Sequence, residues 1–566
     1  DRGIKVSGGP NPRCGKPALS NLPWEPPAIS QNVRWIEAPA LKAALHDSNE
    51  IALLDAREEV PYSYRHLLMA ACVPLSRLEL LVDASVPRRS ARVVWCDDGE
   101  GLAARAAARM NALGYTNVTV LRGGIAAWEA AGYRIYSGVH VPSKAFAEVV
   151  EHAMGTPWIT VEKLKQWIDT KADIALFDSR SFEEFHGNSI PTAISVPGAE
   201  LAYRFADMVS SPATTVVVNC GGRTRSIIGA QSLINAGVPN KVVSLKNGTQ
   251  AWHLSGFEIL KGSNAKPPAV SPQGHEAAKK AAQQVAAKFG VACIGEATLA
   301  RWQTESDTRT LYVFDVRDPA EYTAGHVPGM KNVPGGQLVQ ETDRHAAIWG
   351  ARVVLVDDDG VRAIMTAHWM KQMGWDVAAL TLDMRQHGQQ KGPWVARTLG
   401  MDEARVPEVN ANTLHQRLQA GNLNVVDVGW SRDYLDGHIP GAWYGLRSRL
   451  DEILSKLPAN DAVAFTSSDG VLARLAAMDA QAAGRQTVLT LTGGTAAWRQ
   501  AGYPLEQGAT RMATAPDDVR LKAREQSENV EAAMQEYLSW EIELVNQMAT
   551  DDDQRFTISA RGLSTH

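Results

Sequence analysis

The most informative stretch of the sequence is Val216-Val217-Val218-Asn219-Cys220-Gly221-Gly222-Arg223-Thr224-Arg225-Ser226. Its unbroken apolar start is typical of a buried strand in a parallel sheet. The two glycines after Cys220 favour a tight loop. We expect a helix over 225–236, because apolar residues recur on one side and Gly237 suits its end. The stretch therefore predicts a strand, a loop that begins with a thiol, and a helix.

The same arrangement is written four times along the 566 residues. Each copy begins with an apolar run that ends in aspartate, at Asp55, Asp178, Asp315 and Asp427. A glycine at an expected helix end follows in step, at Gly114, Gly237, Gly374 and Gly484. Successive aspartates are 123, 137 and 112 residues apart and successive glycines 123, 137 and 110, so two independent markers repeat together. Short apolar strands alternating with helices predict α/β domains, each a small, mainly parallel sheet with helices on both faces.

A chain of this length suits about four domains, which agrees with the four copies. We place the domains at 32–137, 155–262, 290–395 and 403–508. Residues 1–31 are rich in Pro, Gly, Ser and Asn and are predicted to be a disordered leader. Residues 263–289 hold a proline-rich linker and a helix, which we expect to separate two pairs of domains. Residues 509–566 are predicted to be a helical tail, in which one long helix over 516–548 is opened by Pro516-Asp517-Asp518.

Bulk composition argues against several classes of protein. A net charge of −5 and a pI near 6.3 give no reason to expect a nucleic-acid partner. No apolar run approaches the roughly 20 residues of a membrane-spanning helix, so we expect no membrane association. The five cysteines lack the spacing of a metal site or a disulfide framework. This predicts no metal and a reducing compartment, the cytoplasm.

Four short motifs keep one order within the copies. They are Asp-x-Arg (at Arg57, Arg180 and Arg317), a turn of the type Gly325-His326-Val327-Pro328-Gly329 or Gly437-His438-Ile439-Pro440-Gly441, the cysteine loop, and Gly-x-x-x-Trp (Gly124 to Trp128, Gly248 to Trp252, Gly494 to Trp498). In this order they resemble the rhodanese family of sulfurtransferases over most of the chain. The resemblance implies four tandem rhodanese-like domains, with the catalytic cysteine in the second and a silent partner in the first.

The loop of the second copy has the residues that thiol chemistry needs. The N–H groups at a helix start, together with Arg223 and Arg225, would lower the pKa of the Cys220 thiol and attract an anion. The residues expected to bind substrate are Gly221, Gly222, Arg223, Thr224, Arg225 and Ser226. Asp178 and Arg180 would brace the loop by ion pairing, and Lys246 would either face the pocket or lie in solvent.

The resemblance also implies a reaction. Cys220 would attack the outer sulfur of thiosulfate, a small anionic donor, and release sulfite. The resulting persulfide would pass its sulfur to cyanide or a thiol, without a metal or organic cofactor.

The other three copies are expected to be inactive. The first reads Cys96-Asp97-Asp98-Gly99-Glu100-Gly101, in which we place Cys96 in the cysteine position but surrounded by carboxylates, as a structural thiol. The third, Asp357-Asp358-Asp359-Gly360-Val361-Arg362, has the arginine but no sulfur. The fourth, Ser467-Ser468-Asp469-Gly470-Val471-Leu472, has neither.

Two other functions are compatible with these motifs. A phosphatase or arsenate reductase also pairs a cysteine with an arginine, but with five residues between them, whereas Cys220 and Arg225 have four. Alternatively, the degraded copies could make the chain a docking scaffold without catalysis. A combination is also possible, in which Cys220 passes sulfur to a protein acceptor docked on the silent domains.

Overall fold

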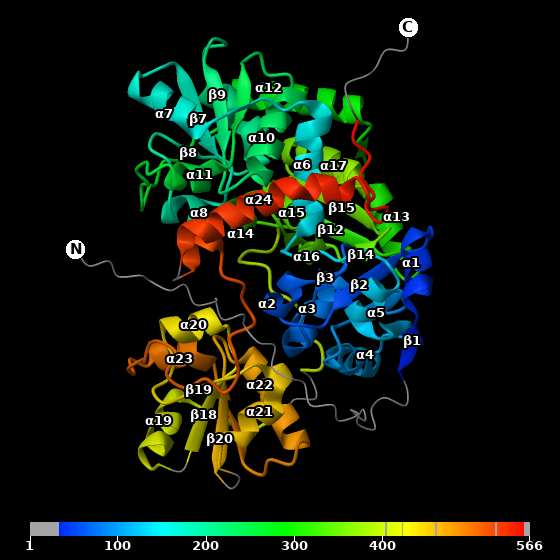
Figure 1. The fold of residues 1–566 in the computed structure, drawn as a ribbon, viewed down its shortest axis with the longest axis vertical. Helices are drawn as coiled ribbons and strands as arrows, with labels where there is room; N and C mark the ends of the chain where they lie inside the picture. The colour runs from blue at the N-terminus through cyan, green and yellow to red at the C-terminus, as the bar shows by residue number, and fades with distance from the viewer. Residues whose placement is uncertain (1–32, 402–404, 422, 459–460, 527–528, 560–566) are drawn as a thin grey trace, which may run out of the picture.

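The computed structural model describes residues 33–401, 405–421, 423–458, 461–526 and 529–559. The predicted disordered leader, 1–31, lies outside the described residues. Within them, the strands form four α/β sheets with helices packed on both faces, as the sequence predicted (Figure 1). No helix in these ranges is long and apolar enough to cross a membrane.

The first domain contains β1 (Arg34–Ile36), α1 (Ala38–His46), β2 (Ile51–Asp55), α2 (Glu59–Tyr64), β3 (Ala71–Cys72), η2 (Leu75–Arg77), α3 (Leu78–Ser85), β4 (Val93–Cys96), α4 (Leu102–Ala112), β5 (Val118–Leu121) and α5 (Gly124–Ala130). Helix α6 (Val141–Met154) then leads to the second domain. The second domain contains β6 (Trp158–Ile159), α7 (Val161–Asp169), β7 (Ile174–Asp178), α8 (Phe182–Gly187), β8 (Ile194–Ser195), α9 (Glu200–Met208), β9 (Thr215–Asn219), α10 (Thr224–Asn235), β10 (Val242–Leu245) and α11 (Gly248–Leu254).

Helix α12 (Pro272–Phe289) precedes the third domain. That domain contains β11 (Ala292–Cys293), α13 (Glu296–Thr304), β12 (Leu311–Asp315), α14 (Pro319–Ala324), β13 (Lys331–Asn332), α15 (Gly335–Gln340), α16 (Thr342–His345), β14 (Ile348–Trp349), β15 (Arg352–Asp357), α17 (Val361–Gln372), β16 (Asp376–Thr381) and α18 (Met384–His387). The fourth contains β17 (Glu408–Val409), α19 (Ala411–Gln419), β18 (Leu423–Asp427), α20 (Ser431–Asp436), β19 (Trp443–Tyr444), η3 (Arg447–Arg449), α21 (Leu450–Ser455), β20 (Ala462–Thr466), α22 (Val471–Ala482), β21 (Val488–Leu491) and α23 (Gly494–Gln500). The tail adds η4 (Ala523–Glu525) and α24 (Val530–Met548).

The second domain shows why these residues form these elements. Its sheet has the order β6-β10-β9-β7-β8 and all its pairs are parallel. Val216, Val217 and Val218 of the central strand β9 are fully buried, as an unbroken apolar strand covered on both faces requires. Helix α10 starts one residue before its predicted position and ends before Gly237, whose φ of +73° suits a helix end.

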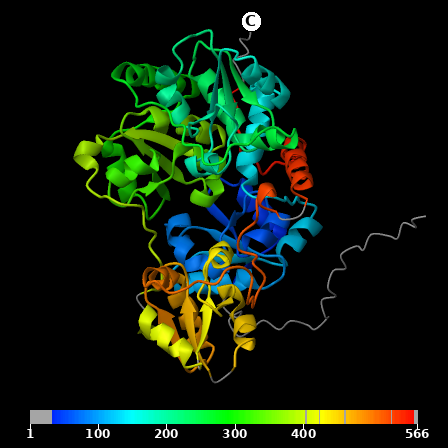
Figure 2. The ribbon, with the colours of Figure 1, turned by 90° about the vertical axis from the view of Figure 1, so that its left-hand side faces the viewer.

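The domains do not associate as two separate pairs, contrary to the sequence-based prediction. Strand β14 of the third domain pairs with β2 of the first, antiparallel, and extends the first sheet. Helix α12 packs on α9 of the second domain and α17 of the third. One apolar cluster therefore joins residues of the first three domains, although the second and third also have clusters of their own. Among the described residues, the fourth domain contributes no buried residue to the shared cluster, and it lies beside the first (Figures 1 and 2).

The long C-terminal helix was predicted to begin at Pro516, and this is wrong: α24 begins at Val530, capped by the Asn529 side chain. The aspartates expected in its first turn have other partners. Asp518 accepts a hydrogen bond from the Ser431 N–H at 2.8 Å, and Asp517 pairs with Arg449 at 2.7 Å. The Val60 N–H of the first domain also donates to the Asp517 carbonyl oxygen at 2.9 Å. Since these contacts hold the segment along the first and fourth domains, the helix starts only after it. Helix α24 then packs on α6 and α11, next to the second domain (Figure 1).

Candidate active site

Cys220 lies between the end of β9 and the start of α10, and its exposed fraction is 2%. The Thr249 N–H donates to the Cys220 carbonyl oxygen at 2.8 Å. Gly248 has a φ of +54°, and a Cβ added to it would lie 2.2 Å from that same oxygen. The Gly-x-x-x-Trp motif therefore places a glycine where the backbone of α11 meets the cysteine loop.

The charge environment of the thiol is mixed. Burial raises the pKa of the Cys220 thiol above its ordinary value, and the nearby Glu541 carboxylate raises it further. The Arg225 guanidinium and the hydroxyl and N–H of Ser226 act in the opposite direction, without reversing the shift. The sequence predicted a lowered thiol pKa. In the structure the net direction is upward, because the site is closed to water.

Asp178 and Arg180 connect neighbouring strand ends below the loop. The Arg180 guanidinium donates to both carboxylate oxygens of Asp178, at 2.9 and 2.7 Å, and both side chains are fully buried. The Asn219 amide donates to Asp178 at 3.0 Å. The pair therefore connects the end of β7 to the residue just before Cys220.

The two arginines of the loop have acidic partners. Arg223 donates to both carboxylate oxygens of Glu148 at 2.7 Å, and it also pairs with Glu151, so it faces α6. Arg225 pairs with Glu184 at 2.6 Å and donates to Gln337 of the third domain at 3.2 Å. Their positive charges are thus largely balanced before any anion arrives.

The Lys246 ammonium group lies 4.1 Å from the centroid of the Trp158 ring, which belongs to the neighbouring strand β6. Thr224 and Ser226 belong to the first turn of α10, and the Ser226 hydroxyl donates to the Arg223 carbonyl at 2.7 Å.

The sequence reasoning missed the residues that cover the loop. Tyr537 and Glu541 of α24 lie against Gly222, with Glu541 Oε2 2.9 Å and Tyr537 Cε1 3.3 Å from the position of an added Cβ. The Tyr537 hydroxyl donates to Glu541 at 2.7 Å, and the Thr224 hydroxyl donates to it at 3.4 Å. No local pattern signals this contact, because more than 300 residues separate α24 from the loop.

Strand register corrects the position assigned to Cys96. Asp178 pairs with Asn219, the residue before Cys220, whereas Asp55 pairs with Cys96 itself. The counterpart of Cys220 in the first domain is therefore Asp97, and Cys96 is a fully buried strand residue.

The residues equivalent to Cys220 in the other domains bind their own helix. Asp97 accepts the Ala103 N–H at 2.9 Å, Asp357 accepts the Ala363 N–H at 2.9 Å, and Ser467 accepts the Ala473 N–H at 3.3 Å. In each case an oxygen of the chain accepts the N–H six residues further on, the position of Ser226 in the second domain, whose N–H bonds to the Cys220 thiol.

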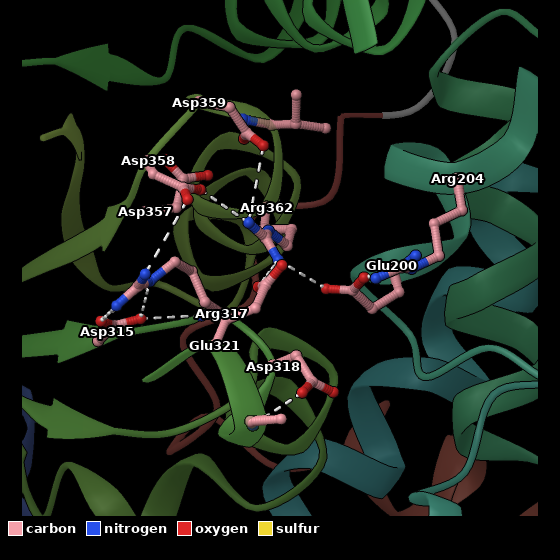
Figure 3. A network of polar contacts seen from close by, with 12 residues as sticks. Glu200, Arg204, Asp315, Arg317, Asp318, Glu321, Asp357, Asp358, Asp359 and Arg362 are labelled. Carbon is pink, nitrogen blue, oxygen red and sulfur yellow. Dashed lines mark hydrogen bonds and ion pairs between the residues drawn. The ribbon is translucent and has the colours of Figure 1, made fainter. Parts of the chain in front are cut away.

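The arginine of the third domain serves the contact between domains (Figure 3). The guanidinium of Arg362, fully buried, contacts Glu200 of the second domain at 3.1 Å and Asp358 at 2.8 Å, and it also pairs with Glu321. Burial and the neighbouring Asp359 raise the pKa of Asp357 to about 8. This site is therefore a closed acidic network without a nucleophile.

Grouped side chains that could hold a metal occur once in the part of the chain that the structure describes, at His46, Asp552 and Asp553. The Lys42 ammonium already contacts both aspartates, at 2.5 and 2.7 Å. This group does not include Cys220.

The fold and the four loops define a class of protein. The model of the rhodanese-like domain matches residues 37–131, 160–255, 297–386 and 410–501, and the chain belongs to the rhodanese family. Among solved structures, it is similar to the thiosulfate sulfurtransferase from Pseudomonas aeruginosa, with 44% identity and a TM-score of 0.90 over 93% of this chain and 100% of that one. A rhodanese-like domain from Anabaena is 28% identical over 22% of this chain and 96% of its own, with a TM-score of 0.17. Curated protein sequences gave no match.

Proposed function

We propose that this rhodanese-type sulfurtransferase takes the outer sulfur of thiosulfate onto Cys220 and passes it to cyanide or a thiol. One observation carries the assignment to Cys220. Of the four equivalent loop positions, 97, 220, 357 and 467, only position 220 holds a thiol. An arginine follows five residues later in the second and third domains, but Arg362 of the third pairs with Asp358 of its own loop, whereas Arg225 does not pair with a carboxylate of its loop. The name of the similar Pseudomonas aeruginosa enzyme supports thiosulfate as the donor.

The chain's own groups have defined tasks in this reaction. The Cys220 thiolate attacks the outer sulfur, the S–S bond of thiosulfate breaks, and sulfite leaves with the bonding electron pair. The persulfide that forms carries one negative charge, which the Ser226 N–H and the Arg225 guanidinium stabilise. A second nucleophile then takes the outer sulfur and regenerates the thiolate.

The closed arrangement requires an opening step. Cys220 is almost without solvent contact, and Tyr537 and Glu541 of α24 cover its loop. We infer that α24 or its side chains move aside when a donor enters.

The four cysteines of the described residues are free thiols, which supports a reducing compartment such as the cytoplasm.

A protein acceptor is also compatible with this proposal. The third domain packs against the second through α15 and α17, and a sulfur-accepting protein could dock on this neighbouring silent domain. Turnover with a small thiol would then be slower than with that partner.

Intact mass spectrometry tests the proposal. Treatment with thiosulfate should add about 32 Da, one sulfur atom, and cyanide should remove it. The Cys220→Ser variant should gain nothing, whereas Cys96→Ser should gain the same mass as the wild type. Sulfur on Cys96, or none on any cysteine, contradicts the assignment.

A further inference from the structure

Helix α24 brings a carboxylate to the catalytic loop. Glu541 is 1% exposed, and its Oε2 atom lies against Gly222, two residues after Cys220. Its other oxygen accepts hydrogen bonds from Tyr537 and Thr224. Glu541 Oε2 is buried and has no hydrogen-bond partner among the described residues. An acid placed in this way contributes little to stability, because part of its desolvation is not compensated.

Charged groups from three elements face Glu541. Helix α6 presents Lys144 and Glu148, the loop presents Arg223 and Cys220, and α24 itself presents Tyr537. Lys144 is buried over the rings of Tyr537 and Trp540, at 5.3 and 5.0 Å, and burial lowers its pKa to about 8. Lys144 is therefore the main cation that opposes the charge of Glu541.

The loop arginines already have carboxylate partners of their own. Arg223 is held by Glu148 and Glu151, and Arg225 is held by Glu184, which also pairs with Lys522 at 3.0 Å. An anionic donor at Cys220 therefore meets arginines that already have carboxylate partners, together with one further carboxylate. Each additional negative charge on the donor increases the repulsion from Glu541.

We propose that Glu541 is a specificity-determining residue that disfavours sulfur donors with two negative charges relative to donors with one. The inference rests on the proposed function of Cys220 and names the donor class that this site prefers: monoanionic sulfane-sulfur compounds. Thiosulfate, a dianion, is then still a donor, but its kcat/KM in the wild-type enzyme is lower than it would be without the charge of Glu541.

Protonation of Glu541 removes the discrimination. Burial raises the pKa of Glu541, so the group is neutral at acidic pH and ionises as the pH rises through that raised value. Repulsion of a dianion is accordingly absent in acid and present in base. Lys144 loses its own charge only near its pKa of about 8, so a change in the ratio well below that pH does not come from Lys144.

Two donors with the same outer sulfur separate charge from chemistry. Thiosulfate carries two negative charges and its leaving group is sulfite. Methanethiosulfonate carries one negative charge and its leaving group is methanesulfinate. In both reactions the Cys220 thiolate bonds to the outer sulfur, the S–S bond breaks with its electrons on the leaving group, and the same persulfide forms. Ionisation of Cys220 affects both donors equally, so it cancels in the ratio of their kcat/KM values.

The experiment measures this ratio, thiosulfate over methanethiosulfonate, with cyanide as acceptor. At about pH 8 the Glu541→Gln variant should raise the ratio about tenfold, and this effect should diminish as the pH is lowered. The control is Glu536→Gln, on the exposed side of the same helix, which should leave the ratio unchanged. An unchanged ratio in Glu541→Gln at alkaline pH overturns the inference.

A second measurement needs no variant. In the wild-type enzyme the ratio should fall as the pH rises through the raised pKa of Glu541, and a ratio that stays flat from acid to about pH 8 contradicts the role of Glu541. Failure of the underlying function gives a different result. If neither donor adds mass to Cys220, the proposed function fails, whereas loading by both donors with a ratio insensitive to Glu541 and pH defeats only this inference.

Discussion

The guanidinium of Arg223 and the carboxylate of Glu148 form a two-point ion pair, with both contacts at 2.7 Å, that connects the cysteine loop to helix α6. Both side chains are buried. In the Glu148→Gln variant Arg223 keeps Glu151 as a charged partner but loses two charge-assisted hydrogen bonds. We therefore expect Glu148→Gln to lower the free energy of unfolding by about 1.5–3 kcal/mol, measured by guanidinium denaturation.

A matched exposed pair provides the control for this prediction. Lys165 and Asp169 form an ion pair at 2.7 Å on the surface of α7. Asp169→Asn should cost at most about 0.5 kcal/mol. Equal effects of Glu148→Gln and Asp169→Asn would show that the Arg223 pair does not hold the loop.

Gly248 should not tolerate a side chain. Gly248→Ala places a Cβ 2.2 Å from the Cys220 carbonyl oxygen at a φ of +54°, so the cysteine loop must shift. We expect destabilisation of more than about 3 kcal/mol and loss of sulfur loading. Gly256 has a φ of +71° but no atom within 4 Å of an added Cβ. Gly256→Ala should therefore cost about 1 kcal/mol and retain loading; similar losses in the two variants would contradict the close approach.

Acid should release the contacts of Glu184. This carboxylate pairs with Arg225 and Lys522, and these cations hold its pKa well below the usual value. A lowered pKa in the folded state means that the pairing stabilises the protein above the unfolded-state pKa of about 4.3 and is lost as the pH falls. The difference in unfolding temperature between wild type and Glu184→Gln should shrink as the pH falls below about 4.3.

The adjacent exposed residue gives the reference for the Glu184 prediction. Glu183→Gln should show a small difference from wild type at every pH, because Glu183 lies at the surface of α8. A Glu184→Gln difference that stays constant with pH would show that ionisation of Glu184 plays no part in stability.

Restoring a thiol to the third domain should not restore chemistry. In a Cys220→Ser background, Asp357→Cys places sulfur at the equivalent position. There Arg362 is held by Glu200, Glu321 and Asp358. The acidic surroundings keep such a thiol protonated and repel an anionic donor. Mass spectrometry should show no addition of about 32 Da after thiosulfate, and any persulfide on this residue would contradict the prediction.

Local sequence was sufficient to predict the fold, and it pointed to one candidate reactive position. The run Val216–Asn219, the glycines that follow and the periodic apolar residues of α10 are short-range signals, and they predicted the strand, the loop and the helix to within one residue. The repeated Asp and Gly markers predicted four such domains, and the thiol in only one complete loop pointed to Cys220. Period and turn chemistry act over a few residues, so the sequence alone contains them.

Tertiary structure decided what lies around that position. The sequence placed Cys96 at the position equivalent to Cys220, but the pairing of Asp55 with Cys96 shows that this position is Asp97. Register depends on the neighbouring strand, so the sequence of one strand does not contain it. Because Asp517 and Asp518 contact distant residues, the last helix begins only at Val530. Glu541 reached Gly222 only because α24 packs back onto α6. Such contacts join segments hundreds of residues apart, and packing of the whole chain fixes them rather than any local pattern.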